Sequence, residues 1–371
     1  MGCGEKMRNI LHVIDTTGPG GAETVFIELL SRLDKRRYRS IVVICGPGWV
    51  GDELQRRGFS PYVIDAKGSF HVTYLWELIK VIRREKIDII QSHLLGSSVY
   101  SCLAGFITRR PVVATLHGIV DFQGERLLGA KLGVINFIAR KMVFVSQNLK
   151  MALLAQIKLN NEKVNVIYNG IDLEQYRVKR DNALRASLGF SPDDVLICSV
   201  GNIRQAKAYD VLIRAAALVV AEKPNIRFII VGENNNSLFD ELSVLRDQLN
   251  LKNHVLFLGF RNDIVDILSG SDLFLSTSSS EGFPLAPLEA MACGTPVIAT
   301  RSGGPEEIIT HEHDGLLVEV NSPPAIAAAV LWLIDNSSVA EELVLRARAT
   351  VHARFSIDTM LSRYEALYAQ L

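Results

Sequence analysis

Two glutamates, Glu281 and Glu289, stand in the second half of the chain with seven residues between them. The intervening Gly282 and Pro284 predict a tight turn, because glycine accepts a positive φ and proline fixes φ. A helix is expected to begin near Leu285, and the backbone N–H groups at its start are free to bind an anion. Carboxylates accept hydrogen bonds from hydroxyl groups. Phosphate-binding amides between two hydroxyl acceptors suit a nucleoside diphosphate-sugar.

Each glutamate also has an ordinary interpretation. Glu281 could be a loop charge, and Glu289 could lie on the solvated face of a helix. The neighbours of Glu289 argue against a solvated position, since Leu288, Ala290 and Met291 are apolar. The combination of glycine, prolines and glutamate spacing therefore favours a binding site over two surface charges.

Two cations, Arg204 and Lys207, follow a predicted strand at 195–200 and precede a predicted helix at 211–223. A loop in this place can grip a diphosphate and stabilise the charge of a departing nucleotide. The alternative is a pair of exposed loop cations. The sequence has no Asp-x-Asp triplet and no His, Cys and Asp cluster with metal-ligand spacing. We therefore expect a reaction without a metal ion and without a cofactor.

A glycine-rich loop with Gly20 and Gly21 follows a predicted strand at 9–15 and precedes a predicted helix at 24–33. This order is typical of turns that hold phosphate groups. A dinucleotide cofactor is the rival interpretation. It fails because Glu23 stands where the third glycine belongs, and because the next predicted strand ends in Cys and Gly where an acidic residue is needed. A turn that holds no ligand stays an alternative.

Two histidines, His93 and His117, each end a predicted strand. The carboxyl ends of parallel strands form the edge at which open α/β sheets bind ligands. Both histidines are therefore candidate ligand contacts. The alternative for His117 is to cap a backbone carbonyl group.

The organisation of the chain follows from its alternating elements. Strand-like and helix-like runs alternate through both halves, which predicts parallel sheets covered by helices on both faces. The length of 371 residues exceeds one ordinary core and suits two domains. We expect an N-terminal domain at 1–172 and a second domain at 173–355.

The charge of the chain is zero overall but unevenly distributed. A neutral chain argues against nucleic acid as a partner. Residues 1–165 contain 23 Lys and Arg but only 14 Asp and Glu. Each basic cluster alone is explained by the favourable position of cations at helix C-termini, whereas their shared sign motivates docking of the first domain on anionic lipids. The clusters are Lys35–Arg39, Arg56–Arg57, Arg83–Arg84 and Arg109–Arg110.

Other features of the sequence bear on location. No stretch approaches the roughly 18 apolar residues of a membrane-spanning helix, and the first residues lack the apolar core of a signal peptide. The cysteines have no metal spacing and are expected to be reduced, mostly buried residues. We therefore expect a cytoplasmic protein, with a peripheral position on the inner face of the membrane as a further hypothesis. The cysteines are Cys3, Cys45, Cys102, Cys198 and Cys293.

The stretch from Glu281 to Pro296, EGFPLAPLEAMACGTP, resembles the signature of the retaining GT-B glycosyltransferases of group 1, or family 4. Two further segments resemble that family, the linker Asn169–Asp172 (NGID) and the turn Gly303–Glu306 (GGPE). The resemblance implies two Rossmann-like, doubly wound domains that face each other across a cleft. It also implies that a C-terminal helix at 356–371 packs back on the first domain.

The activity implied by the resemblance is transfer of a hexosyl group with retention at the anomeric carbon. The donor would be a UDP- or GDP-sugar, and the acceptor a saccharide or a lipid-linked saccharide. Such enzymes assemble envelope polysaccharides and glycolipids. Three alternatives stay open: a nucleotide-sugar epimerase, a phosphorylase whose pyridoxal lysine we cannot identify, and a non-catalytic module that binds sugar nucleotides.

The resemblance also implies roles at the donor end. Glu281 would hold the hydroxyl groups of the sugar, and Glu289 those of the ribose. Arg204 and Lys207 would stabilise the leaving nucleotide, although the family's arginine usually stands at the position of Asn202. The remaining donor contacts would be Gly259, Phe260, Arg261, Gly282, Phe283, Pro284 and Leu285.

In the first domain, the resemblance places His117 against the transferred sugar and Gly20 and Gly21 beneath the donor phosphates. Glu23 and His93 are candidate acceptor contacts. Together these residues predict a catalytic site to which both domains contribute.

Overall fold

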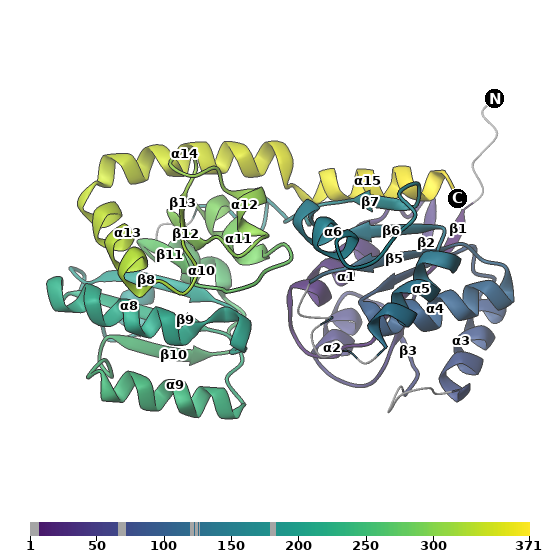
Figure 1. The fold of residues 1–371 in the computed structure, drawn as a ribbon, viewed down its shortest axis with the longest axis horizontal. Helices are drawn as coiled ribbons and strands as arrows, with labels where there is room; N and C mark the ends of the chain where they lie inside the picture. Colours follow the sequence, from purple (N-terminus) through teal and green to yellow (C-terminus); the bar gives the residue numbers. More distant parts are fainter. Residues whose placement is uncertain (1–6, 66–71, 119–121, 123–124, 126, 179–182) are drawn as a thin grey trace. The chain divides into compact units, whose positions relative to one another are not determined.

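The computed structural model describes residues 7–65, 72–118, 122, 125, 127–178 and 183–371. The chain forms two compact units. Unit 1 comprises the chain up to Asn169 together with Ile357–Leu371, and unit 2 comprises Gly170–Ser356. In Figure 1 each unit is a sheet covered by helices.

The sheet of unit 1 is parallel, with the strand order β3-β2-β1-β4-β5-β6-β7 in the described residues. The order reverses between β1 and β4, whose register pairs Ile14 with His93. Ligands of doubly wound sheets bind at the carboxyl edge beside such a switch. The strands are β1 (Arg8–Ile14), β2 (Tyr38–Ile44), β3 (Tyr62–Val63), β4 (Ile89–His93), β5 (Val112–Leu116), β6 (Lys141–Phe144) and β7 (Val164–Val166).

Helices connect these strands, and α3, α4 and α5 pack side by side as one layer. The last helix, α15 (Ile357–Ala369), belongs to unit 1, where the Arg8 side chain donates a hydrogen bond to the Tyr368 carbonyl oxygen at 2.6 Å. The other helices are α1 (Gly21–Arg32), α2 (Trp49–Arg56), α3 (Val72–Arg84), α4 (Leu95–Thr108), α5 (Leu128–Ile138) and α6 (Gln147–Leu154).

The sheet of unit 2 repeats this topology with the order β10-β9-β8-β11-β12-β13, again parallel. Its switch lies between β8 and β11. The two loops that leave these strands therefore meet at one edge of the sheet. The strands are β8 (Val195–Val200), β9 (Ile226–Val231), β10 (Val255–Gly259), β11 (Leu273–Ser276), β12 (Val297–Thr300) and β13 (Leu316–Val318).

The helices of unit 2 have local sequence signals at their ends. Asn236 caps α9 by accepting a hydrogen bond from the Phe239 N–H at 3.1 Å. Gly294 ends α11 in the left-handed conformation (φ 77°) that favours glycine. The helices are α7 (Ala183–Ser187), the 3₁₀ turn η2 (Gln205–Lys207), α8 (Tyr209–Glu222), α9 (Ser237–Gln248), α10 (Ile264–Ser269), α11 (Leu285–Cys293), α12 (Pro305–Ile308), α13 (Pro323–Asp335) and α14 (Ser337–Arg354).

Each sheet lies in the core of its unit, because helices cover both of its faces. Strands buried on both faces read as continuous apolar runs, and β8 (VLICSV) and β9 (IIV at its end) are examples. Cys198 in β8 is fully buried, and Cys102 and Cys293 are buried as well. Within the described residues, no helix combines the length and the apolar character that a membrane span requires.

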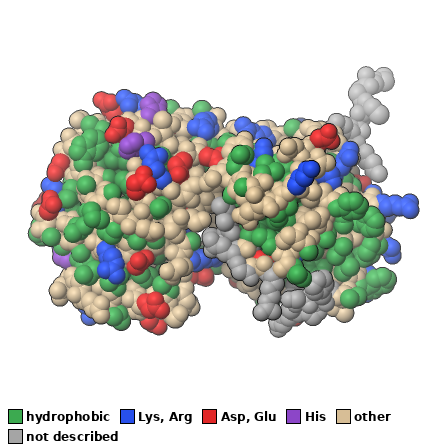
Figure 2. Space-filling model, viewed as in Figure 1, with side chains coloured by type: hydrophobic (Ala, Val, Ile, Leu, Met, Phe, Trp, Pro, Cys, Tyr) green, Lys and Arg blue, Asp and Glu red, His purple; other side chains and the backbone are tan. Residues whose placement is uncertain are grey.

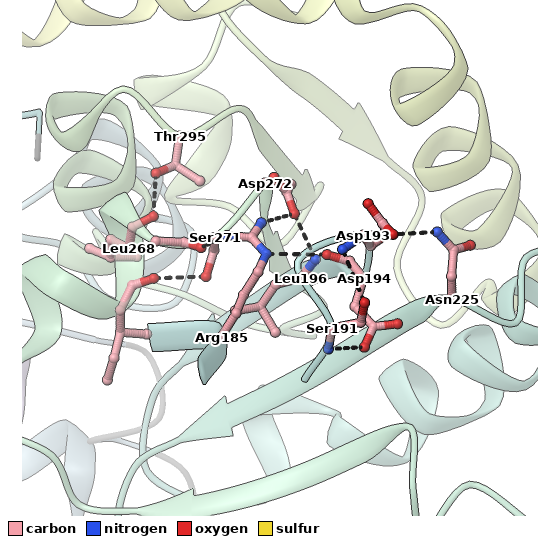
Figure 3. Close-up of polar contacts among 12 residues, drawn as sticks. Arg185, Ser191, Asp193, Asp194, Leu196, Asn225, Leu268, Ser271, Asp272 and Thr295 are labelled. Atoms are coloured by element: carbon pink, nitrogen blue, oxygen red, sulfur yellow. Dashed lines mark hydrogen bonds and ion pairs between the residues drawn. The ribbon is translucent and has the colours of Figure 1, made fainter. Parts of the chain in front are cut away.

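A buried arginine fixes the amino edge of the sheet in unit 2 (Figure 3). The Arg185 guanidinium donates to the carbonyl oxygens of Gly270 at 2.9 Å and Asp194 at 3.2 Å, and it pairs with the Asp272 carboxylate. The same carboxylate accepts from the Leu196 N–H at 2.7 Å. These bonds tie α7 to the starts of β8 and β11, at the end of the sheet opposite to the predicted site.

Candidate active site

The switch of unit 2 brings two predicted site residues into contact. The Lys207 ammonium group lies 2.6 Å from Glu281 Oε1. The Ser278 hydroxyl donates to the same oxygen at 2.7 Å. Both charged side chains are mostly buried, with 24% of Lys207 and 14% of Glu281 exposed. Among the described residues Glu281 Oε2 has no partner, so this oxygen is the one that can accept bonds from a ligand.

The backbone of Glu281 is held by the loop that follows β12. The Glu281 N–H donates to the Ser302 carbonyl oxygen at 2.8 Å, and the Gly304 N–H donates to the Glu281 carbonyl oxygen at 3.0 Å. A Cβ at Gly304 would lie 2.7 Å from the carbonyl oxygen of Gly282. The second glycine of the GGPE turn is therefore a steric requirement for the position of the Glu281 loop.

Helix α11 begins at Leu285, as predicted, and Pro284 occupies the position before it. Within the described residues no side chain caps this terminus, so its first N–H groups are available to an anion. Positive φ, predicted for Gly282, is found instead at Gly303 (φ 106°) in the neighbouring turn. The tight turn thus arises from two loops that bond to each other.

Glu289 lies on α11 and is 92% buried, which excludes a solvated helix face. Burial raises the pKa of its carboxyl group from 4.5 to about 7, because a charged carboxylate loses hydration in an apolar environment. A hydrogen bond with Tyr176 acts in the opposite direction. Glu289 is therefore a carboxyl group whose charge changes near neutral pH.

Glycines make room for Lys207. A Cβ at Gly201 would lie 2.8 Å from Lys207 Cε, so the side chain crosses the end of β8 only because residue 201 is glycine. A Cβ at Gly232 would in turn lie 2.1 Å from the Gly201 carbonyl oxygen. The two glycines let the ends of β8 and β9 approach, and this approach sets the path of the lysine toward Glu281.

The second predicted cation, Arg204, is exposed and has no partner among the described residues. Asn202 stands where the resembling family usually has arginine. Its side-chain oxygen accepts a hydrogen bond from the Glu233 N–H at 3.0 Å. Asn202 thus joins the loops after β8 and β9. Arg204 lies close to Lys207 in the sequence and has no ion-pair partner among the described residues.

The predicted base-binding residues follow β10. Gly259 has φ 68°, which favours glycine, and its carbonyl oxygen accepts from the Gly232 N–H at 2.9 Å. Phe260 is partly exposed, as a ring that stacks on a base must be. Arg261 forms a bidentate pair with Asp263, and this pair lowers the pKa of the aspartate.

In unit 1, the glycine-rich loop ends at the start of α1, with Gly20 as the N-terminal cap and Gly21 as the first helical residue. The buried Glu23 side chain folds back over Gly20, so a Cβ there would lie 2.4 Å from Glu23 Oε2. A Cβ at Gly21 would meet no atom within 4 Å. Contacts within the protein explain Gly20, whereas Gly21 leaves open space that a ligand could approach.

The two predicted histidines of unit 1 are hydrogen-bonded to each other, since His93 Nδ1 lies 2.9 Å from His117 Nε2. Burial lowers the pKa of His117 to about 3 and places the pKa of His93 well below 6.5. The neighbouring His117 and His12 also lower the pKa of His93. Both rings are therefore neutral at physiological pH.

The structure thus brings Lys207 to Glu281 and His93 to His117, each pair within one unit. Sequence reasoning missed Ser278 and Tyr176, the partners of the two glutamates. The run of serines before Glu281 was a usable signal for Ser278, whereas nothing near Tyr176 indicates its partner. Within the described residues, no group of three or more His, Cys, Asp or Glu side chains is placed to hold a metal ion.

Comparison with known proteins decides the family. Residues 180–350 match the family described as glycosyl transferases group 1, and residues 19–175 match glycosyltransferase family 4. The chain is 30% identical, over 302 residues, to N-acetyl-alpha-D-glucosaminyl L-malate synthase of Bacillus anthracis, covering 79% of this chain and 77% of that protein. The chain belongs to the group 1 glycosyltransferases. The predicted resemblance is confirmed, and the protein is a glycosyltransferase.

Two further comparisons concern the chemistry and the fold of this glycosyltransferase. It is 28% identical to UDP-Gal:alpha-D-GlcNAc-diphosphoundecaprenol alpha-1,3-galactosyltransferase of Escherichia coli, over 80% of this chain and 79% of that one. The crystal structure of Anabaena HepE with UDP and glucose superposes with a TM-score of 0.90 and 26% identity, covering 99% of this chain and 100% of HepE. The predicted GT-B architecture of two Rossmann-like domains is confirmed. The enzyme transfers a sugar from a nucleotide-sugar to an acceptor.

Proposed function

We propose that this enzyme transfers a hexosyl group from a UDP-sugar to an anionic, lipid-linked saccharide, with retention at the anomeric carbon and without a metal ion. The observation that carries the proposal is the contact of Lys207 and Ser278 with one oxygen of Glu281, beside the uncapped start of α11. This arrangement places a cation and free N–H groups beside a carboxylate that can accept sugar hydroxyls.

The donor assignment has independent support. HepE binds UDP and UDP-glucose in its crystal structures, and the Escherichia coli relative is named for a UDP-Gal donor. In unit 2, Phe260 is available to stack on the base, and Glu289 is available to bind the ribose. An exposed aromatic ring and a buried carboxyl group suit the two halves of a nucleoside.

In the proposed reaction, the bond between the anomeric carbon and the diphosphate oxygen breaks while the acceptor oxygen bonds to the same face of that carbon. The acceptor proton passes to the departing diphosphate. Lys207, Arg204 and the N–H groups at the start of α11 stabilise the negative charge that develops on UDP. Glu281 Oε2 and His117 hold hydroxyl groups of the transferred sugar, so neither acts as a nucleophile.

Retention is supported by the α linkage in the relative's name, because UDP-galactose itself carries its sugar in the α configuration. Proton NMR of the first product formed tests it, and a β-linked product would refute it. Cationic side chains at the diphosphate support a metal-independent reaction. Transfer that stops after EDTA treatment and returns with a divalent cation would refute that part.

The acceptor is the finer part of the proposal. The names of three relatives point to anionic acceptors: L-malate, inositol 3-phosphate and a diphosphoundecaprenol-linked sugar. Residues 1–165 carry an excess of basic residues. An assay with short-chain diphosphoprenyl saccharides, L-malate and inositol 3-phosphate separates these classes. Transfer to a small acid alone would overturn the lipid-linked assignment.

One experiment tests the donor and the roles of the site together. Thermal unfolding with UDP, GDP and ADP should show the largest stabilisation with UDP, about 2.7 kcal/mol at 100 times its Kd. Glu281→Ala should bind UDP normally but lose most transfer, because UDP carries no sugar. Full transfer with an unchanged donor KM in this variant would refute the role of Glu281. Donor hydrolysis without transfer to any acceptor would favour a binding module, and conversion of the donor sugar would favour an epimerase.

The outer face of the layer α3–α5 supports the lipid part of the proposal. Trp76, Phe106, Ile107 and Phe137 are each more than half exposed on this layer. Figure 2 shows hydrophobic side chains gathered on the surface over α4 and α5. Apolar side chains concentrated on one face indicate an interaction surface.

Arginines surround this apolar surface. A groove of about 750 Å³ lies between the C-terminal ends of α4 and α5, with Phe106, Ile107 and Phe137 in its wall. Arg109, Arg110 and Arg140 also line it, and none has an ion-pair partner in the described part of the chain. Unpaired arginines beside exposed aromatic rings are complementary to anionic headgroups above an acyl layer. We propose that this face docks on the inner leaflet of the cytoplasmic membrane.

Co-sedimentation with vesicles tests this docking surface. The full chain should bind vesicles that contain phosphatidylglycerol and not vesicles of phosphatidylcholine alone. Replacing the three arginines by Gln should weaken binding more than a hundredfold, at about 1 kcal/mol for each arginine. Phe106→Ser with Phe137→Ser should weaken it as well, and Arg363→Gln on the exposed face of α15 is the matched control. No binding at low salt, or equal loss in the control, would refute the proposal.

A further inference from the structure

A chain of buried polar groups runs through unit 1 from the C-terminal helix to His117. The Tyr368 hydroxyl donates to Gln91 Oε1 at 3.0 Å. Gln91 Nε2 lies 3.3 Å from His93 Nε2, and His93 Nδ1 lies 2.9 Å from His117 Nε2. Tyr368, Gln91 and His93 are fully buried, and His117 keeps only 9% of its surface exposed. A polar chain in the core of a sheet needs a consistent set of donors and acceptors.

The orientation of the Gln91 amide follows from its neighbours. Its nitrogen lies 3.2 Å from the Ser92 carbonyl oxygen and 2.8 Å from the Thr115 hydroxyl oxygen. A carbonyl oxygen only accepts, so the NH₂ group must be on this side and the amide oxygen must face Tyr368. The reversed amide would set two carbonyl oxygens against each other.

The amide orientation determines the protonation of both histidines. His93 Nε2 faces an NH₂ group, which only donates, so a proton on this nitrogen would have no acceptor there and Nε2 is unprotonated. A neutral imidazole has one N–H, which must then be on His93 Nδ1, where it donates to His117 Nε2. The proton of neutral His117 is therefore on Nδ1. The two rings are inclined by only 24°, which suits a bond between ring edges.

We propose that Gln91 and His93 are positioning residues that keep His117 in its Nδ1–H form, so that it presents a hydrogen-bond donor at the carboxyl edge of β5. The inference rests on the proposed contact of His117 with the transferred sugar. His117 Nε2 is occupied by His93, and Nδ1 has no partner in the described residues. His117 therefore donates to a sugar oxygen and does not take a proton from the acceptor.

The same chain assigns a role to the C-terminal helix. Tyr368 holds the amide oxygen of Gln91, and the Tyr364 hydroxyl lies 3.3 Å from the Thr115 hydroxyl. Both tyrosines stand on α15 and are buried. Helix α15 thus supplies the last partners of this hydrogen-bonded series, whereas the Ser92 carbonyl oxygen fixes its direction.

Nitrogen-15 NMR of the full chain with labelled histidine tests the protonation directly, since protonated and unprotonated imidazole nitrogens differ strongly in chemical shift. His93→Asn and His117→Asn variants assign the signals. In the wild-type enzyme both residues should be Nδ1–H forms. An Nε2–H form of His117 in the wild-type spectrum would overturn the inference whatever the activity.

The variant Gln91→Glu should reverse the donor-to-acceptor direction of the hydrogen bonds that run from this position to His117. Once the new carboxyl group is ionised it only accepts, so His93 would donate from Nε2 and would accept from His117 Nε2–H. His117 would then present a bare Nδ1, and kcat/KM for the donor should fall about tenfold, as for one lost hydrogen bond. Tyr368→Phe keeps the direction of these hydrogen bonds and should leave the nitrogen-15 signal of His117 unchanged. Affinity for UDP, which has no sugar, should be unchanged in both variants.

Two outcomes are distinguishable. If the wild-type forms are as expected but His117→Asn transfers sugar normally, the proposed contact of His117 fails and the protonation pattern stands. If Gln91→Glu folds and His117 keeps its Nδ1–H form at a pH at which the new carboxyl group is ionised, the control by Gln91 and His93 is refuted, even if His117 is essential.

Discussion

The buried carboxyl group of Glu289 should make this enzyme less stable as the pH rises. Its folded pKa of about 7 lies above the unfolded value of 4.5, because burial disfavours the charged form. Between these two pH values the folded state holds the proton more tightly than the unfolded state does. The free energy of unfolding therefore falls as pH rises through this range, and the loss is complete above about pH 7.

The substitution Glu289→Gln removes the ionisation and keeps the shape. The difference between 4.5 and about 7 corresponds to about 3 kcal/mol at 1.36 kcal/mol per pH unit. The variant should therefore be more stable than the wild type by up to about 3 kcal/mol at pH 8, and by almost nothing at pH 4. Urea unfolding at a series of pH values measures this difference.

The control for this experiment is Glu341→Gln, an exposed glutamate on α14 of the same unit. It should shift the unfolding midpoint little at any pH. Affinity for UDP should fall in Glu289→Gln, because a neutral amide is a weaker partner for ribose hydroxyls than a carboxylate. A difference in stability that is constant from pH 4 to pH 8 would refute the reasoning.

Four other substitutions have definite expectations. Gly21→Ala should leave the melting temperature unchanged and raise the donor KM roughly tenfold. Gly20→Ala should displace Glu23 and so lower the melting temperature in addition to raising the donor KM. Equal effects of the two substitutions would contradict the geometry. Gly304→Ala should lower kcat and also weaken UDP binding, because its Cβ would push Gly282 and Pro284, which lead from the catalytic glutamate into the start of α11. Arg185→Met should cost about 2 kcal/mol of unfolding free energy with normal donor KM, and kinetics plus urea unfolding separate the two effects.

Much of the site in unit 2 could be predicted because its signals are local. The glutamate spacing, the prolines and the apolar neighbours of Glu289 lie within one short segment, and the helix begins at Leu285 as expected. The alternation of strands and helices also predicted the parallel sheets, and the carboxyl edge follows from that topology. Local sequence determines turns and helix starts, so these inferences needed no long-range contact.

The long-range contacts that hold the site residues in place could not be predicted from local sequence patterns. Lys207 and Glu281 are 74 positions apart, and their pairing depends on the absence of a Cβ at Gly201. Tyr368 and Gln91 are 277 positions apart. Residues so far apart in the sequence are brought together by the packing of the folded chain. No local sequence pattern indicates which of them will pair. The role assigned to His117 from the resemblance stays a prediction.

Helix α15 has a consequence for how the protein is made. Synthesis proceeds from the N-terminus, so the sheet of unit 1 and the whole of unit 2 emerge before α15 exists. Until then the Gln91 amide, which ends up fully buried, lacks its tyrosine partner, and Arg8 lacks the Tyr368 carbonyl oxygen. A nascent chain can therefore complete unit 2 on the ribosome but must leave the first unit unfinished. A chain cut before Tyr368 would contain a complete unit 2 and a first unit that lacks the tyrosine partner of Gln91.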